Sequence, residues 1–434
     1  MDLLTANDRP GRYPPSLYAA QNALDLHQRP SLEGAVEADV CVVGGGFTGL
    51  SSAIHLAEKG FRVVVLEAQR VAFGASGRNG GQVGAGQRLD QDELEKLVGL
   101  AHAKELAGLA QEAVELVKSL AKRPEIDCPF HPGIIHAAHK ASYVVDEHAY
   151  VEKLRTQYDY PHISSLTQAE LQEVIASPAY FGGSIDRASG HLDPLRYALG
   201  LARLAESLGV TIFEGARVKS IHNGAKVKLR TDSGSVTAEH VILGCNGYLG
   251  GLDKQVAAHV MPINNFIVAT APMTADEQEQ IIKNNHAVAD SKFVINYFRF
   301  SDDHRLVFGG TESYGYKFPA DIAANVRKPL AQIFPQLAGM QIDYAWGGSL
   351  GITMNRMPHF ARLTGNVLSM SGFSGHGIAM ATLAGKLGAE AIAGQAERFD
   401  IMADVPTPRF PGGAKLRGPL LILGMLWFSL RDRL

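Results

Sequence analysis

Cysteine is scarce in this chain of 434 residues, with only Cys41, Cys128 and Cys245. Three widely spaced cysteines exclude a disulfide framework, and such sparse usage is typical of proteins from reducing compartments. Cys41 and Cys245 both fall in apolar, strand-like runs, so we predict that both are buried, inert thiols. The sixteen histidines are scattered without metal-ligand spacing, and we therefore predict no metal site.

The chain also lacks a charge excess and a long apolar run. Its formal net charge is -3, which gives no indication of a nucleic-acid surface. The first 21 residues have no basic start followed by an apolar run, so we expect no secretory signal and a cytoplasmic protein. The uncharged run at residues 418–430 is too short to cross a bilayer. We expect it to dock on the protein; interfacial membrane attachment through Leu426, Trp427 and Phe428 is the alternative.

The length of the chain exceeds what one hydrophobic core usually serves, so we expect two domains. Patterns of strand, glycine turn and helix occur near both ends, whereas residues 256–344 contain short strands typical of an antiparallel sheet. We predict an α/β fold with a discontinuous, Rossmann-like domain formed by residues 1–90, 180–255 and 345–434. A smaller α+β domain with an antiparallel sheet would then comprise residues 91–179 and 256–344.

The most informative pattern is a buried strand, a glycine turn, a helix and a second strand. Gly44, Gly46 and Gly49 match G-x-G-x-x-G after the run ADVCVV, and the second strand, RVVVLE, ends in Glu67. The glycines allow a tight turn, a close approach of backbone to a pyrophosphate, and close helix packing. Glu67 can accept hydrogen bonds from a ribose and would repel a 2′-phosphate, which disfavours NADP. The pattern predicts dinucleotide binding; an ordinary glycine-rich turn is the alternative.

A second glycine-rich segment follows the strand that ends at Glu67. Residues 74–86 hold six glycines with polar residues between them. Ordering so many glycines is entropically unfavourable, which makes sense where backbone must come close to a flat ligand. A flexible surface loop is the alternative, but the position after the ribose-binding strand favours a binding loop.

Three helices between these regions can be predicted from their spacing and end signals. Apolar residues recur at three and four over residues 91–121, which predicts a helix there. Thr167 and Glu170 have the spacing of a capping box. Asp193 is a candidate N-cap with Pro194 in the first helical position.

Several motifs occur in a fixed order along the chain: DVCVVGGGFTGLSSAIHLAEKGFRVVVLEA, FGASGRNGGQ, YFRF…RLVFGG, DYAWGG, NRMPHF and GFSGHGIAMATLAGKL. This ordered set resembles the FAD-dependent amine oxidases of the D-amino-acid oxidase, sarcosine oxidase and glycine oxidase group. The resemblance covers nearly the whole chain. It is greatest to the gamma-glutamylputrescine oxidase subfamily, whose pattern also includes GGSIDRASGHLDPL and PRFPGG…SLRDRL.

The resemblance implies FAD as the cofactor, enclosed by the βαβ unit, the glycine loop and the turn GFSGHG. The cofactor-binding positions that it implies are Gly44, Gly46, Phe47, Thr48, Gly49, Glu67, Ala68, Ser76, Gly77, Arg78, Asn79, Gly80, Gln82, Val218, Gly247, Gly372, Gly375, His376 and Gly377. The last three would begin a helix facing the flavin N1–C2=O edge, where a helix N-terminus stabilises negative charge. No cysteine precedes MPHF and no histidine closely follows Glu67, so we expect non-covalent FAD.

The reaction that the resemblance implies is a two-electron oxidation of a carbon bearing an amine. A hydride passes to flavin N5, the imine hydrolyses, and dioxygen reoxidises the flavin to give hydrogen peroxide. The expected substrate is gamma-glutamylputrescine or a related gamma-glutamylated amine, and the products are an aldehyde and ammonia. A sarcosine- or glycine-type oxidase, a flavin dehydrogenase that reduces a quinone or carrier protein, and a non-catalytic flavoprotein sensor are the alternatives.

Candidate catalytic residues lie on the predicted substrate and flavin faces. Tyr297 and Arg299 are two apart on a strand, so they share one face, which could meet the flavin or solvent. Trp346 could lie beside the flavin ring, or it could belong to the hydrophobic core. His376 could act through its side chain or only through its N–H group. The candidates for an arginine that holds a substrate carboxylate are Arg78, Arg299 and Arg356.

Overall fold

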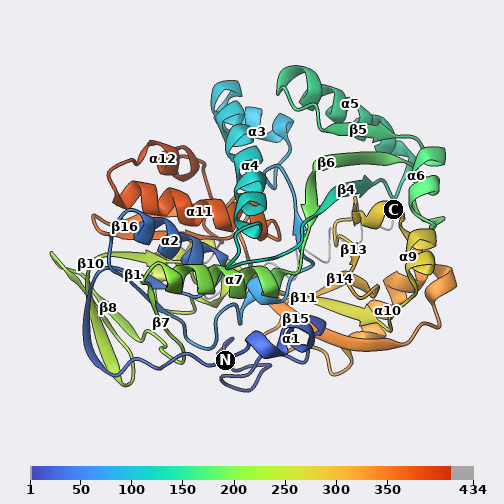
Figure 1. The fold of residues 1–434 in the computed structure, drawn as a ribbon. Coiled ribbons are helices and arrows are strands. Elements are labelled where there is room, and N and C mark those ends of the chain that lie inside the picture. Colours follow the sequence, from blue (N-terminus) through green and yellow to red (C-terminus); the bar gives the residue numbers. More distant parts are fainter. Residues whose placement is uncertain (1, 412–434) are drawn as a thin grey trace.

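The computed structural model describes residues 2–411, so the expectation for residues 418–430 lies outside this part of the chain. Two β-sheets lie side by side, each with its own helices (Figure 1). A search of the described residues for a helix long and apolar enough to pass through a bilayer finds none. The arrangement confirms the predicted α/β fold with two sheets of different kind.

The first sheet has a parallel centre. It comprises β1 (Gly34–Val43), β2 (Val63–Leu66), β7 (Thr211–Phe213), β8 (Ser220–His222), β9 (Val227–Arg230), β10 (Gly234–Leu243), β16 (His359–Thr364) and β17 (Val367–Ser371). β17, β10, β1, β2 and β7 are parallel neighbours in that order, and β16, β9 and β8 add antiparallel strands. The inner strands are runs of Val, Ile and Leu because other elements cover both faces of the sheet.

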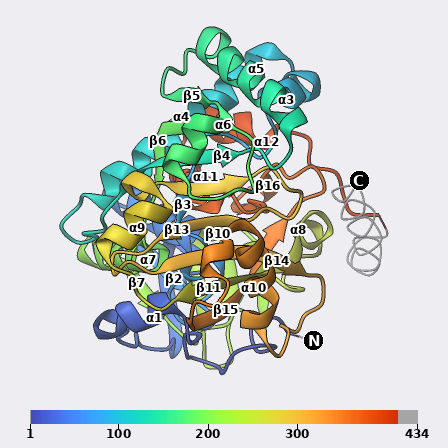
Figure 2. The ribbon, with the colours of Figure 1, turned by 90° about the vertical axis from the view of Figure 1, so that its right-hand side faces the viewer.

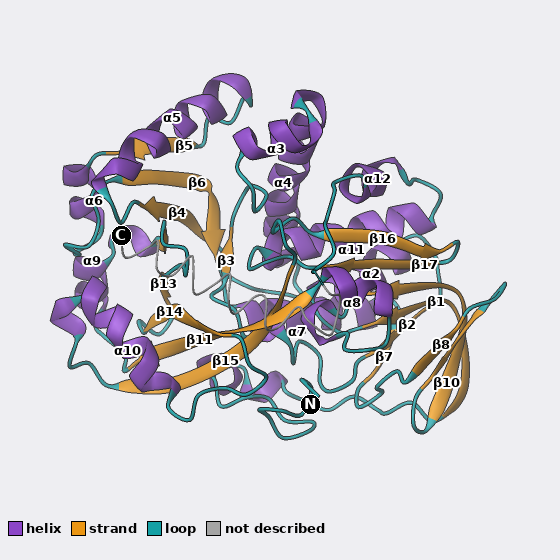
Figure 3. Ribbon diagram, turned by 180° about the vertical axis from the view of Figure 1, so that it is seen from behind, coloured by secondary structure: helices purple, strands orange, loops and turns teal. Residues whose placement is uncertain are grey.

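The helices packed beside this sheet are α2 (Phe47–Glu58), α4 (Leu100–Ala121), α7 (Pro194–Ser207), α11 (Gly377–Ile392) and α12 (Glu397–Ala403). Figure 3 shows them grouped beside the strands of the first sheet. The Asp193 side chain accepts the N–H groups of Leu195 and Arg196 at 2.9 and 3.0 Å, and Pro194 takes the first position of α7. The predicted cap of this helix is thereby confirmed.

The second sheet is mostly antiparallel. It comprises β3 (Gln82–Val83), β4 (His131–Ala137), β5 (Ile163–Leu166), β6 (Gly183–His191), β11 (Met261–Thr270), β12 (Ala287–Asp290), β13 (Tyr297–Phe300), β14 (Leu306–Ser313) and β15 (Ile342–Ile352). Only the β12–β4 pair is parallel among the pairs of described strands in this sheet. The antiparallel strands predicted within residues 256–344 are therefore present.

The second sheet is covered on its outer side by short helices, which Figure 2 shows around it. They are α5 (Ala141–Gln157), α6 (Gln168–Val174), α9 (Ala275–Ile281) and α10 (Ile322–Ile333); α1 (Leu17–Gln21), α3 (Gln91–Val98) and α8 (Lys254–His259) complete the set described. In the core between the sheet and α10, Phe298 stacks on Phe308 and meets Phe334 edge to face. The predicted capping box of Thr167 and Glu170 starts α6.

Some elements do not lie where the predicted segments placed them. The helix predicted at 91–121 is broken at Gly99, whose φ of +83° separates α3 from α4. α4 packs on α11 beside the first sheet, although its residues were assigned to the second domain. β6 belongs to the second sheet, although residues 180–255 were assigned to the first domain. The boundaries between the two domains stay a prediction.

Candidate functional site

One large cavity, with a volume of about 620 Å³, takes its walls from both sheets. Most of the predicted cofactor positions line it. These are Gly44, Gly46, Phe47, Thr48, Glu67, Ala68, Ser76, Arg78, Asn79, Gly80, Gln82, Val218, Gly375, His376 and Gly377. Gly49, Gly77, Gly247 and Gly372 are absent from its lining, and their part in cofactor binding stays a prediction.

The first end of the cavity is the glycine turn between β1 and α2. Gly44 has a φ of +107°, and an added Cβ would lie 2.9 Å from the carbonyl oxygen of Gly244. A Cβ at Gly46 would lie 2.7 Å from Ser76 Oγ, and the Ser76 hydroxyl accepts the Phe47 N–H at 3.0 Å. The N-terminus of α2 thus lines the cavity, and the small Ser76 side chain contacts its first N–H group. Such a helix start favours an anion such as a pyrophosphate.

Three of the predicted glycines that do not line the cavity allow close packing or an uncommon backbone conformation behind it. A Cβ at Gly49 would lie 1.9 Å from the carbonyl oxygen of Gly44, so this glycine lets α2 sit directly on the turn, as predicted. A Cβ at Gly77 would lie 2.4 Å from the carbonyl oxygen of Ala72. Gly372 has a φ of +78°, which disfavours other residues there. These positions shape the cavity walls from behind.

Glu67 lies at the end of β2 and lines the cavity. Its carboxylate accepts the N–H groups of Gly45 and Gln69 at 2.7 and 2.8 Å. Burial is the main cause that raises the pKa of Glu67 to about 7, and the two N–H donors oppose this shift. A carboxylate held at this point can accept ribose hydroxyls, which is the role the sequence predicts.

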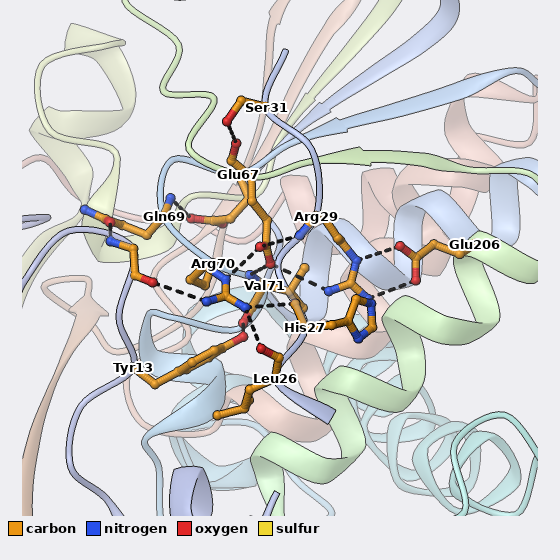
Figure 4. Close-up of polar contacts among 12 residues, drawn as sticks. Tyr13, Leu26, His27, Arg29, Ser31, Glu67, Gln69, Arg70, Val71 and Glu206 are labelled. Atoms are coloured by element: carbon orange, nitrogen blue, oxygen red, sulfur yellow. Dashed lines mark hydrogen bonds and ion pairs between the residues drawn. The ribbon is translucent and has the colours of Figure 1, made fainter. Parts of the chain in front are cut away.

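A buried ion network supports the loop behind Glu67 (Figure 4). Glu214 is fully buried, and it accepts the Arg70 Nε–H at 2.7 Å and the backbone N–H groups of Val71 and Arg29. Arg29 also donates to both oxygens of Glu206, at 2.6 and 2.9 Å. The network ties the amino-terminal segment to the residues that follow β2.

The glycine loop forms the next part of the wall. Asn79 Nδ2 donates to the carbonyl oxygens of Ala75 and Ser76, both at 3.0 Å, which closes the loop on itself. A Cβ at Gly80 would lie 2.5 Å from the Tyr297 ring. Gln82 lines the cavity, and its Nε2 donates to the Val288 carbonyl at 2.8 Å. The loop is fixed by these contacts, which favours the binding-loop interpretation over a flexible surface loop.

The start of α11 forms the opposite wall, where Gly375, His376 and Gly377 line the cavity. The His376 Nε2–H donates to the carbonyl oxygen of Gly84 at 3.1 Å. Burial lowers the pKa of His376 to about 4, and the positive charge of Arg88 adds to this shift. The imidazole is therefore neutral at pH 7, so the helix N-terminus, and not a histidine charge, supplies positive potential here.

These features fit a flavin dinucleotide. The turn after β1 admits a pyrophosphate only because side chains are missing there, and Glu67 stands where a ribose would lie. A Cβ at Gly80 would overlap the Tyr297 ring, so the missing side chain lets the glycine loop pack directly against β13. The α11 N-terminus presents N–H groups without a side-chain cap. Two helix N-termini and a buried carboxylate line one cavity, and they fit the pyrophosphate, the flavin edge and a ribose of FAD.

The structure separates the predicted catalytic residues into two groups. Tyr297 and His376 line the cavity, whereas Arg299 and Trp346 lie behind its wall. Arg299 Nε donates to the carbonyl oxygen of Gly80 at 2.8 Å. Trp346 is buried, and its Nε1 donates to the carbonyl oxygen of Arg78 at 3.0 Å. The strand face shared by Tyr297 and Arg299 meets the glycine loop, and Trp346 takes the core alternative; a catalytic role for either Arg299 or Trp346 stays a prediction.

Several lining residues were not predicted. Arg88 follows the glycine loop, and Glu312 and Asn265 come from β14 and β11. The Tyr297 hydroxyl donates to Asn265 Oδ1. Cys245 also lines the cavity and is only partly buried, which corrects the expectation of a fully buried thiol; burial raises the pKa of Cys245 to about 12. No local sequence pattern marked Arg88 as a residue of the cavity.

The cavity continues into a polar arm beside α5 and β6. Glu147, Tyr150, Tyr160 and Asp186 line it. Asp186 accepts the Tyr160 hydroxyl at 2.8 Å and the Ser189 hydroxyl at 2.5 Å. Space therefore extends past the predicted flavin position into the second sheet, as an elongated substrate would need.

Comparison with protein families matches residues 39–391 to the family model described as FAD dependent oxidoreductase, DAO. The chain is 41% identical over 405 residues to a probable oxidoreductase OrdL from Rhizobium meliloti, covering 93% of this chain and 94% of that one. It is 39% identical over 420 residues to the gamma-glutamylputrescine oxidoreductase of Escherichia coli, covering 96% and 98% of the two chains.

Solved structures share the fold. The crystal structure of glycine oxidase from Geobacillus kaustophilus gives a TM-score of 0.71 at 22% identity, covering 83% of this chain and 95% of that one. L-proline dehydrogenase from P. horikoshii gives a TM-score of 0.69 at 20% identity, covering 90% and 99%. Both likenesses concern the arrangement of the two sheets and their helices.

Proposed function

The chain belongs to the DAO family of FAD dependent oxidoreductases, and from this premise we propose that it oxidises the terminal amine of a gamma-glutamylated amine such as gamma-glutamylputrescine. The amine, dioxygen and water would give an aldehyde, ammonia and hydrogen peroxide. When bound, FAD supplies the acceptor for the two electrons of the C–H bond next to the amine.

The observation that carries this proposal is the set of hydrogen bonds that the candidate arginines already make within the protein. Arg78 is buried and donates to Phe73, Gly347 and Asp8. The Arg299 guanidinium is likewise committed, to the carbonyl oxygens of Gly80 and Phe300 and the hydroxyl of Tyr18.

The Arg299 guanidinium lies behind the cavity wall, and that of Arg78 already pairs with Asp8 at 2.9 Å, although Arg78 Nη2 has no hydrogen-bond partner among the described residues. Arg356 does line the cavity, but on the loop after β15 and not on the glycine loop. This distribution favours a substrate whose reacting carbon bears no carboxylate. The 39% identity to gamma-glutamylputrescine oxidoreductase supports the same class.

The residues around the proposed reacting centre bind and orient without a strong acid–base pair. Neutral His376 fixes the glycine loop, and Tyr297 holds Asn265 through its hydroxyl. Phe293 and Ile295 add an apolar wall, which helps to exclude water and favours the neutral, reactive form of an amine.

The test is product analysis with the purified holoenzyme. We expect one ammonia, one aldehyde and one hydrogen peroxide for each gamma-glutamylputrescine consumed in air. Turnover of sarcosine or glycine at a higher kcat/KM would contradict the proposal. Reduction of a quinone or dye without peroxide would instead make the protein a dehydrogenase.

We also expect FAD to be non-covalent. The denatured protein should release free FAD into the supernatant, and a fluorescent flavin band on a denaturing gel would contradict this expectation.

A further inference from the structure

Three charged side chains that the proposed reaction does not use meet in the cavity. Arg88 comes from the loop between β3 and α3, Glu312 from β14, and Arg356 from the loop after β15. Each lines the same cavity, and their charges interact with one another. The set carries two positive charges and one negative charge on segments far apart in the sequence.

The two arginines are partly buried and lack the acidic partners that the buried Arg70 and Arg78 have. Within the described residues, Arg88 Nε is buried without a hydrogen-bond partner. No carboxylate of the described residues forms a salt bridge with Arg88 or Arg356, whereas Arg70 and Arg78 each pair with an acid at 2.7 and 2.9 Å. A desolvated guanidinium without a counter-ion is unfavourable, so an incoming anion would be stabilised there.

The Arg356 and Glu312 side chains are held in position. Arg356 has a φ of +67°, an uncommon backbone conformation for this residue, and its guanidinium stacks 5.2 Å from the centroid of the Phe293 ring. The Tyr314 hydroxyl donates to Glu312 Oε2 at 3.2 Å. These contacts orient a cation and a carboxylate toward one cavity before any ligand binds.

The charges of Arg88, Arg356 and Glu312 together favour the binding of an anion. Burial lowers the pKa of Arg88 to about 10, and the neighbouring charge of Arg356 lowers it further, so Arg88 stays protonated at pH 7. Burial raises the pKa of Glu312, while Arg356 opposes this shift. An added carboxylate would relieve the repulsion between the two guanidiniums.

Unlike the two arginines, the acidic groups of the polar arm already have hydrogen-bond partners. Asp186 already accepts hydrogen bonds from Tyr160 and Ser189, and Glu147 accepts one from Ser184 at 2.5 Å. Their hydrogen-bonding capacity is largely used inside the protein. The arginine pair is therefore the better candidate for recognising a charged part of the substrate.

We propose that Arg88, Arg356 and Glu312 form the subsite for the free α-amino acid end of a gamma-glutamylated amine. The two guanidiniums bind the α-carboxylate, and Glu312 accepts hydrogen bonds from the α-ammonium group. This assignment rests on the proposed function, since it names the group that the subsite recognises at the end of the substrate opposite the reacting amine.

The test uses three substrates that share the reacting amine and the amide. Gamma-glutamylputrescine carries both charges, N-glutarylputrescine lacks only the ammonium, and N-butanoylputrescine lacks both. For Arg88→Met and Arg356→Gln, the ratio of kcat/KM for gamma-glutamylputrescine to that for N-butanoylputrescine should fall on the order of tenfold to hundredfold, mainly through KM. For Glu312→Gln, the ratio of gamma-glutamylputrescine to N-glutarylputrescine should fall. Arg62→Gln, at an exposed arginine, is the matched control.

A binding measurement separates this subsite from the proposed reaction. L-Glutamine has the same α-amino acid end and amide, so it should perturb the visible flavin spectrum of the holoenzyme at lower concentration than butanamide. Arg88→Met should abolish that difference. Unchanged substrate ratios and unchanged L-glutamine binding in folded, flavin-loaded Arg88→Met and Arg356→Gln would overturn the subsite. If L-glutamine binding depends on Arg88 but gamma-glutamylputrescine is not oxidised, the proposed function fails and the subsite stands.

Discussion

The Nε2 of His376 lies 3.1 Å from the carbonyl oxygen of Gly84, and this hydrogen bond joins the start of α11 to the end of the glycine loop. The fit is close, because a Cβ at Gly84 would lie 2.9 Å from His376 Cε1. Two segments separated by most of the chain thus close on each other at the cavity. Their contact sets the width of the space into which the flavin must fit.

Acid should destabilise the contact between α11 and the glycine loop by protonating His376. Its pKa is about 4 in the folded chain against 6.5 without burial, so unfolding takes up a proton between these values. The stability contributed by neutral His376 is therefore present above pH 6.5 and is lost as the pH falls toward 4, by at most about 3 kcal/mol. His376→Asn can still donate to Gly84 but does not titrate. Between pH 8 and pH 4.5 the melting temperature of the wild type should fall more than that of His376→Asn, and parallel curves would contradict this account.

Glu67 should make FAD affinity depend on pH. In the free protein its pKa is about 7, raised chiefly by burial from 4.5. The stability from protonated Glu67 is therefore lost as the pH rises from 4.5 through 7, whereas ribose hydroxyls favour the charged carboxylate. We expect FAD to bind more tightly at pH 8 than at pH 6, and this dependence should be much smaller for Glu67→Gln. The FAD affinity of each protein can be measured at each pH by titrating the deflavinated protein with FAD and recording the quenching of flavin fluorescence. An equal pH dependence of FAD affinity in the two proteins would show that Glu67 does not cause it.

Arg299 and Tyr297 should affect different properties. Arg299→Gln removes a buried cation from the carbonyl oxygens of Gly80 and Phe300, so the free energy of unfolding should fall by about 2–4 kcal/mol, with loss of bound flavin. Tyr297→Phe keeps the ring against Gly80 and should change stability by about 1 kcal/mol, while the rate of flavin reduction falls. Denaturant unfolding and anaerobic stopped-flow absorbance separate the two effects. A slow but fully stable Arg299→Gln would mean that Arg299 contacts the substrate after all.

The ion network behind Glu67 should be important for stability. Glu214→Gln leaves the buried guanidiniums of Arg29 and Arg70 with less negative charge, and we expect a loss of about 3–5 kcal/mol in the free energy of unfolding. Arg62→Gln breaks an exposed pair with Asp39 and should change it by less than about 1 kcal/mol. Urea unfolding of the holoenzyme compares them, and equal effects would show that the network contributes no more than a surface pair.

Much of the cofactor site could be predicted because its signals are local. The glycine turn, Glu67 and the caps at Asp193 and Thr167 lie within short segments whose physical roles depend on spacing alone. The break at Gly99 was missed because apolar spacing continues through it, although a glycine with positive φ ends a helix.

The substrate side was harder to predict because its residues meet only in the folded chain. Arg299 and Trp346 lie in patterns that could face a ligand, but the carbonyl oxygens that they serve belong to a distant loop. Arg88 and Glu312 have no local motif at all. They share a wall only because the loop after β3 and the end of β14 meet at one cavity.

The most direct test of the central claim is anaerobic reduction of the FAD-loaded enzyme. Gamma-glutamylputrescine, sarcosine, glycine and putrescine would be mixed with it in turn while the visible flavin band is recorded. We predict rapid bleaching with gamma-glutamylputrescine, much slower bleaching with putrescine, and none with sarcosine or glycine. Bleaching by sarcosine or glycine alone, or no bleaching by gamma-glutamylputrescine, would contradict the account.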